Sequence, residues 1–139
     1  MDYEALMKAA EQARKLAYAP YSGFRVGAAL LATDGSVYCG CNVENASFSA
    51  TNCAERTAFF RAVSDGMRKF SAIAIVGGKG EALSELCAPC GVCRQVMAEF
   101  CNSDFQIVLG HSGNLKIYTL GELLPCTFTD MDGERESTP

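Results

Sequence analysis

The first part of the chain changes from a helical to a strand pattern of apolar positions. Apolar side chains recur every three or four positions over residues 4–18, which predicts an amphipathic helix that ends before Pro20. Residues 24–33 form an apolar run typical of a strand, Asp34-Gly35 is a hairpin turn, and residues 36–43 return as a second strand. These two strands are expected to pair antiparallel.

The rest of the chain alternates between helices and strands. The patterns predict helices over 53–63, 89–101 and 120–124, and strands over 70–76, 105–109 and 115–118. Asn52 is the candidate N-cap of the first of these helices. We therefore expect one domain over residues 1–139, a three-layer α/β/α sandwich with a five-stranded mixed sheet, followed by a flexible polar tail over 129–139.

Composition restricts the class of protein. The 139 residues are 49% hydrophobic and 20% charged, which is ordinary for a globular domain. The net charge of −4, without a run of basic residues, argues against a nucleic-acid partner. The first residues do not resemble a signal peptide, and no apolar run is long enough to cross a membrane. We expect a cytoplasmic protein without a membrane partner.

The eight cysteines are many for a reducing compartment, where metal binding or catalysis is a better interpretation than disulfides. Four of them stand singly among apolar or turn residues and are expected to be buried small side chains: Cys39, Cys41, Cys101 and Cys126. Cys87 is ambiguous. The remaining three have a spacing that predicts a metal site.

Cys90 and Cys93 are three residues apart at the start of a predicted helix, so both sulfurs face one side and can hold one ion. Cys53 begins another predicted helix and is followed two residues later by Glu55. Three protein ligands leave one position open for water, which is typical of catalytic zinc.

Other interpretations of these cysteines stay open. A Cys-x-x-Cys pair at a helix N-terminus can also be a redox pair. Cys87 could close a four-cysteine structural site, although Pro89 bends the chain between it and Cys90. His111 is expected to be a solvent-facing turn residue rather than a ligand. A zinc-stabilised interaction module without catalysis would not need Glu55.

Three thiolates and Zn²⁺ carry a net negative charge that nearby groups should compensate. Two helix N-termini supply part of this compensation. Arg56 and Gln95 are placed to donate hydrogen bonds to the sulfurs.

These motifs resemble those of the cytidine deaminases. Cys53-Ala54-Glu55 and the later Pro89-Cys90-Gly91-Val92-Cys93 are similar to the deaminase signature of a ligand-x-Glu followed by P-C-x-x-C. The similarity extends over nearly the whole chain, through segments 18–22, 26–30, 40–45 and 122–125. The all-cysteine ligand set is similar to that of the small homotetrameric members.

The resemblance implies hydrolytic deamination of cytidine and deoxycytidine to uridine and deoxyuridine in pyrimidine salvage. A zinc-bound hydroxide would attack the base, with one zinc per chain held by Cys53, Cys90 and Cys93, and Glu55 would be the proton shuttle. The residues implied to bind the nucleoside are Asn42 and Glu44 at the ribose, Phe24 on the pyrimidine, backbone at Ala54 on the base edge, and Ala46, Phe48 and Phe128 reaching a neighbouring subunit's site in a homotetramer.

Without the resemblance, Phe24 and Phe128 would be interpreted as core residues and 42–45 as a turn. Close relatives commonly have Tyr where this chain has Phe48, so a hydroxyl near the 5′ end of the sugar is absent. Blasticidin S deaminases are a related alternative, but they lack the intact Asn42-Val43-Glu44-Asn45 segment that is present here.

Overall fold

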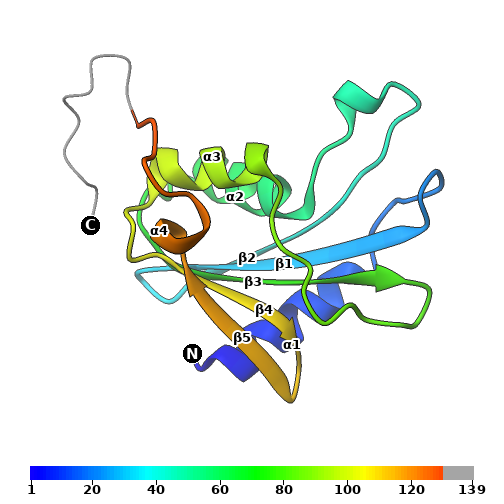
Figure 1. Cartoon of the computed structure of the whole chain (residues 1–139), viewed down its shortest axis with the longest axis horizontal. Coiled ribbons are helices and arrows are strands. Elements are labelled where there is room, and N and C mark those ends of the chain that lie inside the picture. The colour runs from blue at the N-terminus through cyan, green and yellow to red at the C-terminus, as the bar shows by residue number, and fades with distance from the viewer. Residues whose placement is uncertain (130–139) are drawn as a thin grey trace.

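The computed structural model describes residues 1–129, so most of the predicted polar tail over 129–139 lies outside the described residues. The five strands are β1 (Phe24–Ala32), β2 (Val37–Cys41), β3 (Phe70–Lys79), β4 (Gln106–His111) and β5 (Asn114–Thr119). They form one sheet in the order β2-β1-β3-β4-β5 (Figure 1). The β3–β4 pair is parallel and the other neighbours are antiparallel, which confirms the predicted five-stranded mixed sheet.

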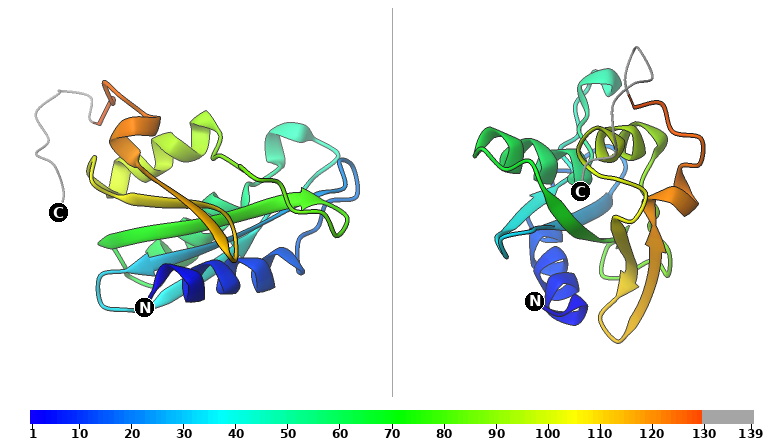
Figure 2. Two further views of the ribbon diagram at one scale, coloured as in Figure 1. Left: turned by 60° about the horizontal axis from the view of Figure 1, so that its bottom comes forward. Right: turned by 90° about the vertical axis from the view of Figure 1, so that its left-hand side faces the viewer.

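Helices cover both faces of this sheet. Helix α1 (Tyr3–Arg14) packs on one face, while α2 (Ala54–Ser64) and α3 (Gly91–Phe100) lie on the other (Figure 2). The short α4 (Leu120–Leu123) follows β5, and a 3₁₀ turn, η1 (Phe48–Ala50), lies in the loop before α2. The three-layer α/β/α prediction is confirmed.

Alternate residues of the central strands build two cores. On β3, Ile73 and Ile75 pack toward α2 and α3, whereas Ala72 and Ala74 pack toward α1. Successive side chains of a strand point to opposite faces, so one apolar run serves both layers.

Several predicted boundaries were wrong. Asn52 is not the N-cap of α2, because helical backbone begins at Ala54 and Cys53 takes that position. The strand predicted over 70–76 continues to Lys79, since its glycines still pair with β1. The predicted burial of the single cysteines is confirmed for Cys101 alone. Cys39 and Cys41 are half-buried, and Cys126 is exposed with a φ of 54°.

Among residues 1–129, none of the helices is both long and apolar enough to cross a bilayer.

Candidate active site

The N-termini of α2 and α3 bring three sulfurs together. Cys53 and Cys90 are the N-cap residues of these helices, and Cys93 lies in the first turn of α3. The three Sγ atoms lie within 4.8 Å of one another, and those of Cys53 and Cys90 are 3.8 Å apart. Within the described residues this is the one group of three or more potential metal ligands, and neither Cys87 nor His111 belongs to it.

The geometry and chemistry of these residues fit zinc. Tetrahedral zinc with Zn–S bonds of about 2.3 Å places its sulfur ligands about 3.8 Å apart. A hydrogen bond with Cys93 and the neighbouring guanidinium of Arg56 lower the pKa of Cys53 to about 5, whereas the same hydrogen bond raises the pKa of Cys93. The first negative charge of this pair therefore lies on Cys53, as the thiolate form that a metal requires. Helix N-termini also stabilise negative charge. Three ligands leave one position of a tetrahedral ion open.

Arg56 lies against the cluster. Its Nη2 is 3.2 Å from Cys53 Sγ, and this hydrogen bond raises the pKa of the guanidinium. The Nε of Arg56 is buried and has no hydrogen-bond partner among the residues that the structure describes. A guanidinium N–H beside the clustered sulfurs can stabilise the negative charge of cysteine thiolates.

The predicted hydrogen bond from Gln95 to a sulfur is not present. Gln95 Nε2 instead donates to the backbone carbonyl of Phe128 at 2.7 Å. Gln95 follows Cys93 by two residues, so it projects from a different face of α3.

Glu55 is a buried carboxyl group next to the sulfurs. It lies in the first turn of α2 and its side chain is 5% exposed. Burial raises the pKa of Glu55 to about 7, so the group can both accept and release a proton near neutral pH.

Cys87 is a different kind of cysteine. Burial, with a further contribution from the charges of Glu55 and Cys53, raises the pKa of its thiol to about 12. Cys87 lies outside the cluster of three sulfurs, so its geometry does not make it a fourth ligand.

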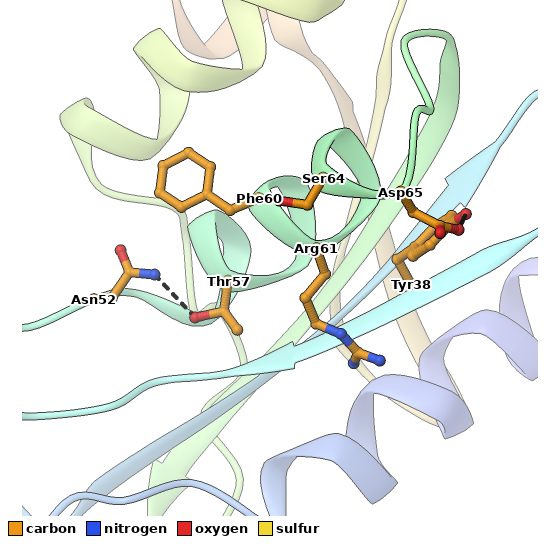
Figure 3. A pocket seen from close by; sticks show the side chains of 7 residues that line it. All are labelled: Tyr38, Asn52, Thr57, Phe60, Arg61, Ser64 and Asp65. Atoms are coloured by element: carbon orange, nitrogen blue, oxygen red, sulfur yellow. Dashed lines mark hydrogen bonds between the residues drawn. The ribbon is translucent and has the colours of Figure 1, made fainter.

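A chain of hydrogen bonds holds Cys53 in place. Asn52 Nδ2 donates to Thr57 Oγ1 at 3.0 Å (Figure 3), and Thr57 Oγ1 donates to the carbonyl of Cys53 at 3.1 Å. Asn52 and Val43 exchange two backbone hydrogen bonds. The start of α2 is thus attached to the segment after β2.

A hollow of about 640 Å³ lies on the outer side of α2, and Asn52 and Thr57 form part of its lining (Figure 3). None of the three clustered cysteines lines this hollow.

Asn42 is mostly used in the fold. It is 8% exposed, its Oδ1 accepts from Val26 N at 2.8 Å, and its Nδ2 donates to the carbonyl of Phe24 at 2.8 Å. This pairing attaches the end of β2 to the start of β1. One amide N–H and one acceptor lone pair remain for a ligand.

Glu44 lines a cavity of about 350 Å³ together with Tyr21, Ser22, Phe48 and Thr51. Its carboxylate accepts hydrogen bonds from the backbone N–H groups of Tyr21 and Ser22 and from the hydroxyl of Ser22. The hydroxyl of Ser22 holds the pKa of Glu44 below its usual range. The group is therefore an oriented anion.

The other predicted nucleoside-binding residues fall into two groups. Phe24 is half-buried at the start of β1, and Ala54 is buried at the start of α2. Ala46, Phe48 and Phe128 are exposed in the single chain, with exposed fractions of 79% for Phe48 and 61% for Phe128.

The site geometry agrees with the comparisons to known proteins. A family model described as the cytidine and deoxycytidylate deaminase zinc-binding region matches residues 1–109. The chain belongs to this deaminase family. A cytidine deaminase of Sporosarcina psychrophila is 52% identical over 133 residues, which are 95% of each chain. Another, of Halalkalibacterium halodurans, is 53% identical over 133 residues, covering 95% of this deaminase and 98% of that protein.

Solved structures support the same family. The crystal structure of a cytidine deaminase from Burkholderia pseudomallei has a TM-score of 0.85 and 50% identity, covering 92% of this deaminase and 100% of that chain. The match extends beyond the metal site to nearly the whole fold.

The sequence motifs indicate no individual role for Ser22 or Thr57. Ser22 lies in segment 18–22, which carried part of the resemblance, but its contact with Glu44 joins residues 22 positions apart. No local pattern reveals such a contact. Thr57 lies four residues after Cys53, a spacing that could have suggested a bond to the Cys53 carbonyl.

Proposed function

We propose that this deaminase hydrolyses cytidine and deoxycytidine to uridine and deoxyuridine with release of ammonia. The observation that carries the proposal is a buried carboxyl group, Glu55, beside three clustered sulfurs that leave one position of a tetrahedral metal open.

Cys53, Cys90 and Cys93 would hold the zinc ion, which when bound supplies a Lewis acid that activates water. Glu55 takes a proton from the attacking water and gives it to N3 of the pyrimidine. The water oxygen bonds to C4, and Glu55 then moves the remaining proton of that oxygen to the 4-amino group. The C4–N bond breaks as the C4 carbonyl forms, and the amino group leaves as ammonia. The pKa of about 7 that burial confers on Glu55 suits both proton acceptance and proton donation.

The nucleoside would be held by groups at the ends of β1 and β2. The free amide N–H of Asn42 and the carboxylate of Glu44 suit ribose hydroxyls, while Phe24 packs on the pyrimidine and the backbone at Ala54 contacts the base edge. Among residues 1–129, Glu44 is the one charged residue that lines its cavity. A phosphate there would meet an anion without a cation to neutralise it, so the free nucleoside is the substrate rather than CMP or a polynucleotide.

An ammonia-release assay with cytidine, deoxycytidine, CMP and blasticidin S, combined with zinc analysis of the same sample, tests this proposal. We expect turnover of both nucleosides, strong rejection of CMP and one zinc per chain. Blasticidin S as the preferred substrate would establish the alternative deaminase activity. Zinc without turnover of any of the four would indicate an interaction module.

We also propose a homotetramer whose neighbouring subunits complete each site. Cys90 is exposed in the single chain, as are the aromatic rings of Phe48 and Phe128, although an active site needs to exclude water. Light scattering should give four times the chain mass. Phe48→Ser should weaken both assembly and activity, whereas Ile117→Ser, a matched exposed apolar position on β5, should change neither. A fully active monomer would contradict the shared site.

Three broader proposals accompany this activity. The site requires reduced thiolates, which supports a location in the cytoplasm. The reaction would return pyrimidine nucleosides to use as uridine and deoxyuridine, which is pyrimidine salvage. Residues 1–139 would function as one deaminase domain.

A further inference from the structure

The hydrogen bonds of Glu44 leave one well-defined acceptor position. A carboxylate has about four lone-pair sites. Oε1 accepts from the N–H groups of Tyr21 at 2.9 Å and Ser22 at 3.0 Å, and Oε2 accepts from the hydroxyl of Ser22. One lone pair of Oε2 therefore remains for a ligand, and Ser22 decides which one.

The Ser22 hydroxyl is itself oriented by the backbone. While it donates to Glu44, it accepts a hydrogen bond from the N–H of Phe24 at 2.9 Å. The same hydroxyl thus connects the carboxylate proposed to bind ribose with the residue proposed to pack on the base.

The segment that carries Ser22 is held against the end of β2. Tyr18 N donates to the carbonyl of Asn42 at 3.0 Å, and Glu44 N donates to the carbonyl of Tyr18 at 2.8 Å. Gly23 N closes the turn by donating to the carbonyl of Ala19 at 3.0 Å. Because these bonds fix the backbone on both sides, the hydroxyl of Ser22 is preorganised rather than free to rotate away.

We propose that Ser22 is a positioning residue for substrate recognition, which acts through Glu44 by directing one lone pair of Oε2 toward a ribose hydroxyl. This inference rests on the proposed nucleoside deaminase function. It predicts an effect on binding of the sugar rather than on proton transfer, because Ser22 contacts neither Glu55 nor a clustered cysteine in the hydrogen bonds of the site.

Steady-state kinetics with cytidine and 2′,3′-dideoxycytidine separate these roles. With cytidine, Ser22→Ala should raise KM about three- to tenfold, the effect of one lost hydrogen bond, and leave kcat nearly unchanged. With dideoxycytidine, which lacks the 2′ and 3′ hydroxyls, the same variant should behave like the unaltered enzyme. Ser22→Thr keeps the hydroxyl and should restore most of the cytidine affinity.

Controls make each outcome decisive. Ser71→Ala, an exposed serine at the start of β3, should leave both substrates unaffected. Zinc content and melting temperature verify each fold, and Ser22→Cys, a weaker donor of similar size, replaces Ser22→Ala if that variant does not fold.

Glu44→Ala distinguishes failure of this inference from failure of the proposed function. Equal KM increases on both substrates, or normal kinetics of Ser22→Ala while Glu44→Ala is impaired on cytidine, would overturn the role of Ser22 alone. Normal cytidine kinetics of Glu44→Ala would overturn the ribose assignment, and with it this inference.

Discussion

Helices cover both faces of the sheet, yet only one face carries the candidate active site. Under α1 the sheet presents mainly small side chains, such as Ala29, Ala72 and Ala74. Under α2 and α3 it presents larger ones, including Ile73 and Ile75. The chemical groups stand at the N-termini of the helices on this second face, where dipoles favour thiolates. A packed sheet face supplies stability, and adjacent helix N-termini on it supply a site.

Each face also contains a close approach that requires glycine. A Cβ on Gly27 would lie 2.0 Å from the carbonyl oxygen of Ala10 in α1. A Cβ on Gly40 would lie 2.5 Å from the carbonyl oxygen of Ala54 in α2. The two contacts have similar geometry, but only the second holds the helix that carries Cys53 and Glu55.

The largest effect on zinc content and activity should come from substitution of the clustered cysteines. Cys53→Ala removes a proposed zinc ligand and should abolish zinc binding and deaminase activity together, because binding of the metal depends on the complete set. Cys101→Ala, a buried cysteine in the core of the same face, should keep both. Metal analysis and activity of the two variants provide the comparison. Loss of zinc from Cys87→Ala would instead support a closed four-cysteine site.

The next largest effect should come from Glu55 at the start of α2, where a loss of turnover can be separated from a loss of folding. Glu55→Gln should remain folded and zinc-loaded, but turnover should fall by about 10²- to 10⁴-fold, the usual contribution of general acid–base catalysis. Steady-state activity assays and metal analysis of one preparation measure turnover and zinc content. Turnover close to that of the unaltered enzyme would exclude Glu55 as the proton shuttle.

Substitutions of Gly27 and Gly40 compare how the two faces of the sheet contribute to stability and to activity. Gly27→Ala and Gly40→Ala should each lower the free energy of unfolding by about 1–3 kcal/mol, because the new methyl group overlaps helix backbone. We expect only Gly40→Ala to lower kcat of the folded fraction as well, since it displaces the first turn of α2. Denaturant unfolding and active-site-normalised kinetics test this. An equal loss of kcat in both variants would mean that the faces are not functionally separate.

The smallest effect should be confined to the α1 face. Glu11 in α1 accepts hydrogen bonds from the backbone N–H and the hydroxyl of Ser112, each at 2.8 Å, and so holds the β4–β5 turn. Glu11→Ala should lower the free energy of unfolding by about 1 kcal/mol and leave zinc content and turnover unchanged. Thermal unfolding with a parallel activity assay measures the effect. A change in activity would reveal coupling between the two faces.

The sequence by itself determined the architecture and the composition of the candidate site. Apolar periodicity is a local property, so it indicated the helices, the strands and the mixed sheet that the structure contains. The spacing of Cys90 and Cys93 also determined that their sulfurs share a helix turn. The third thiolate and the acidic residue after it were visible as a motif.

Only the tertiary structure decided which side chains actually meet. In the fold, Gln95 donates a hydrogen bond to the carbonyl of Phe128, and the Ser22 hydroxyl donates one to the Glu44 carboxylate. Asn42 uses most of its side-chain hydrogen-bonding capacity to join β1 to the end of β2. The tertiary structure also decided that burial, rather than a neighbouring charge alone, raises the pKa of Glu55. These features depend on contacts between residues far apart in the chain and on exclusion of water, and neither is encoded in a local pattern of residues.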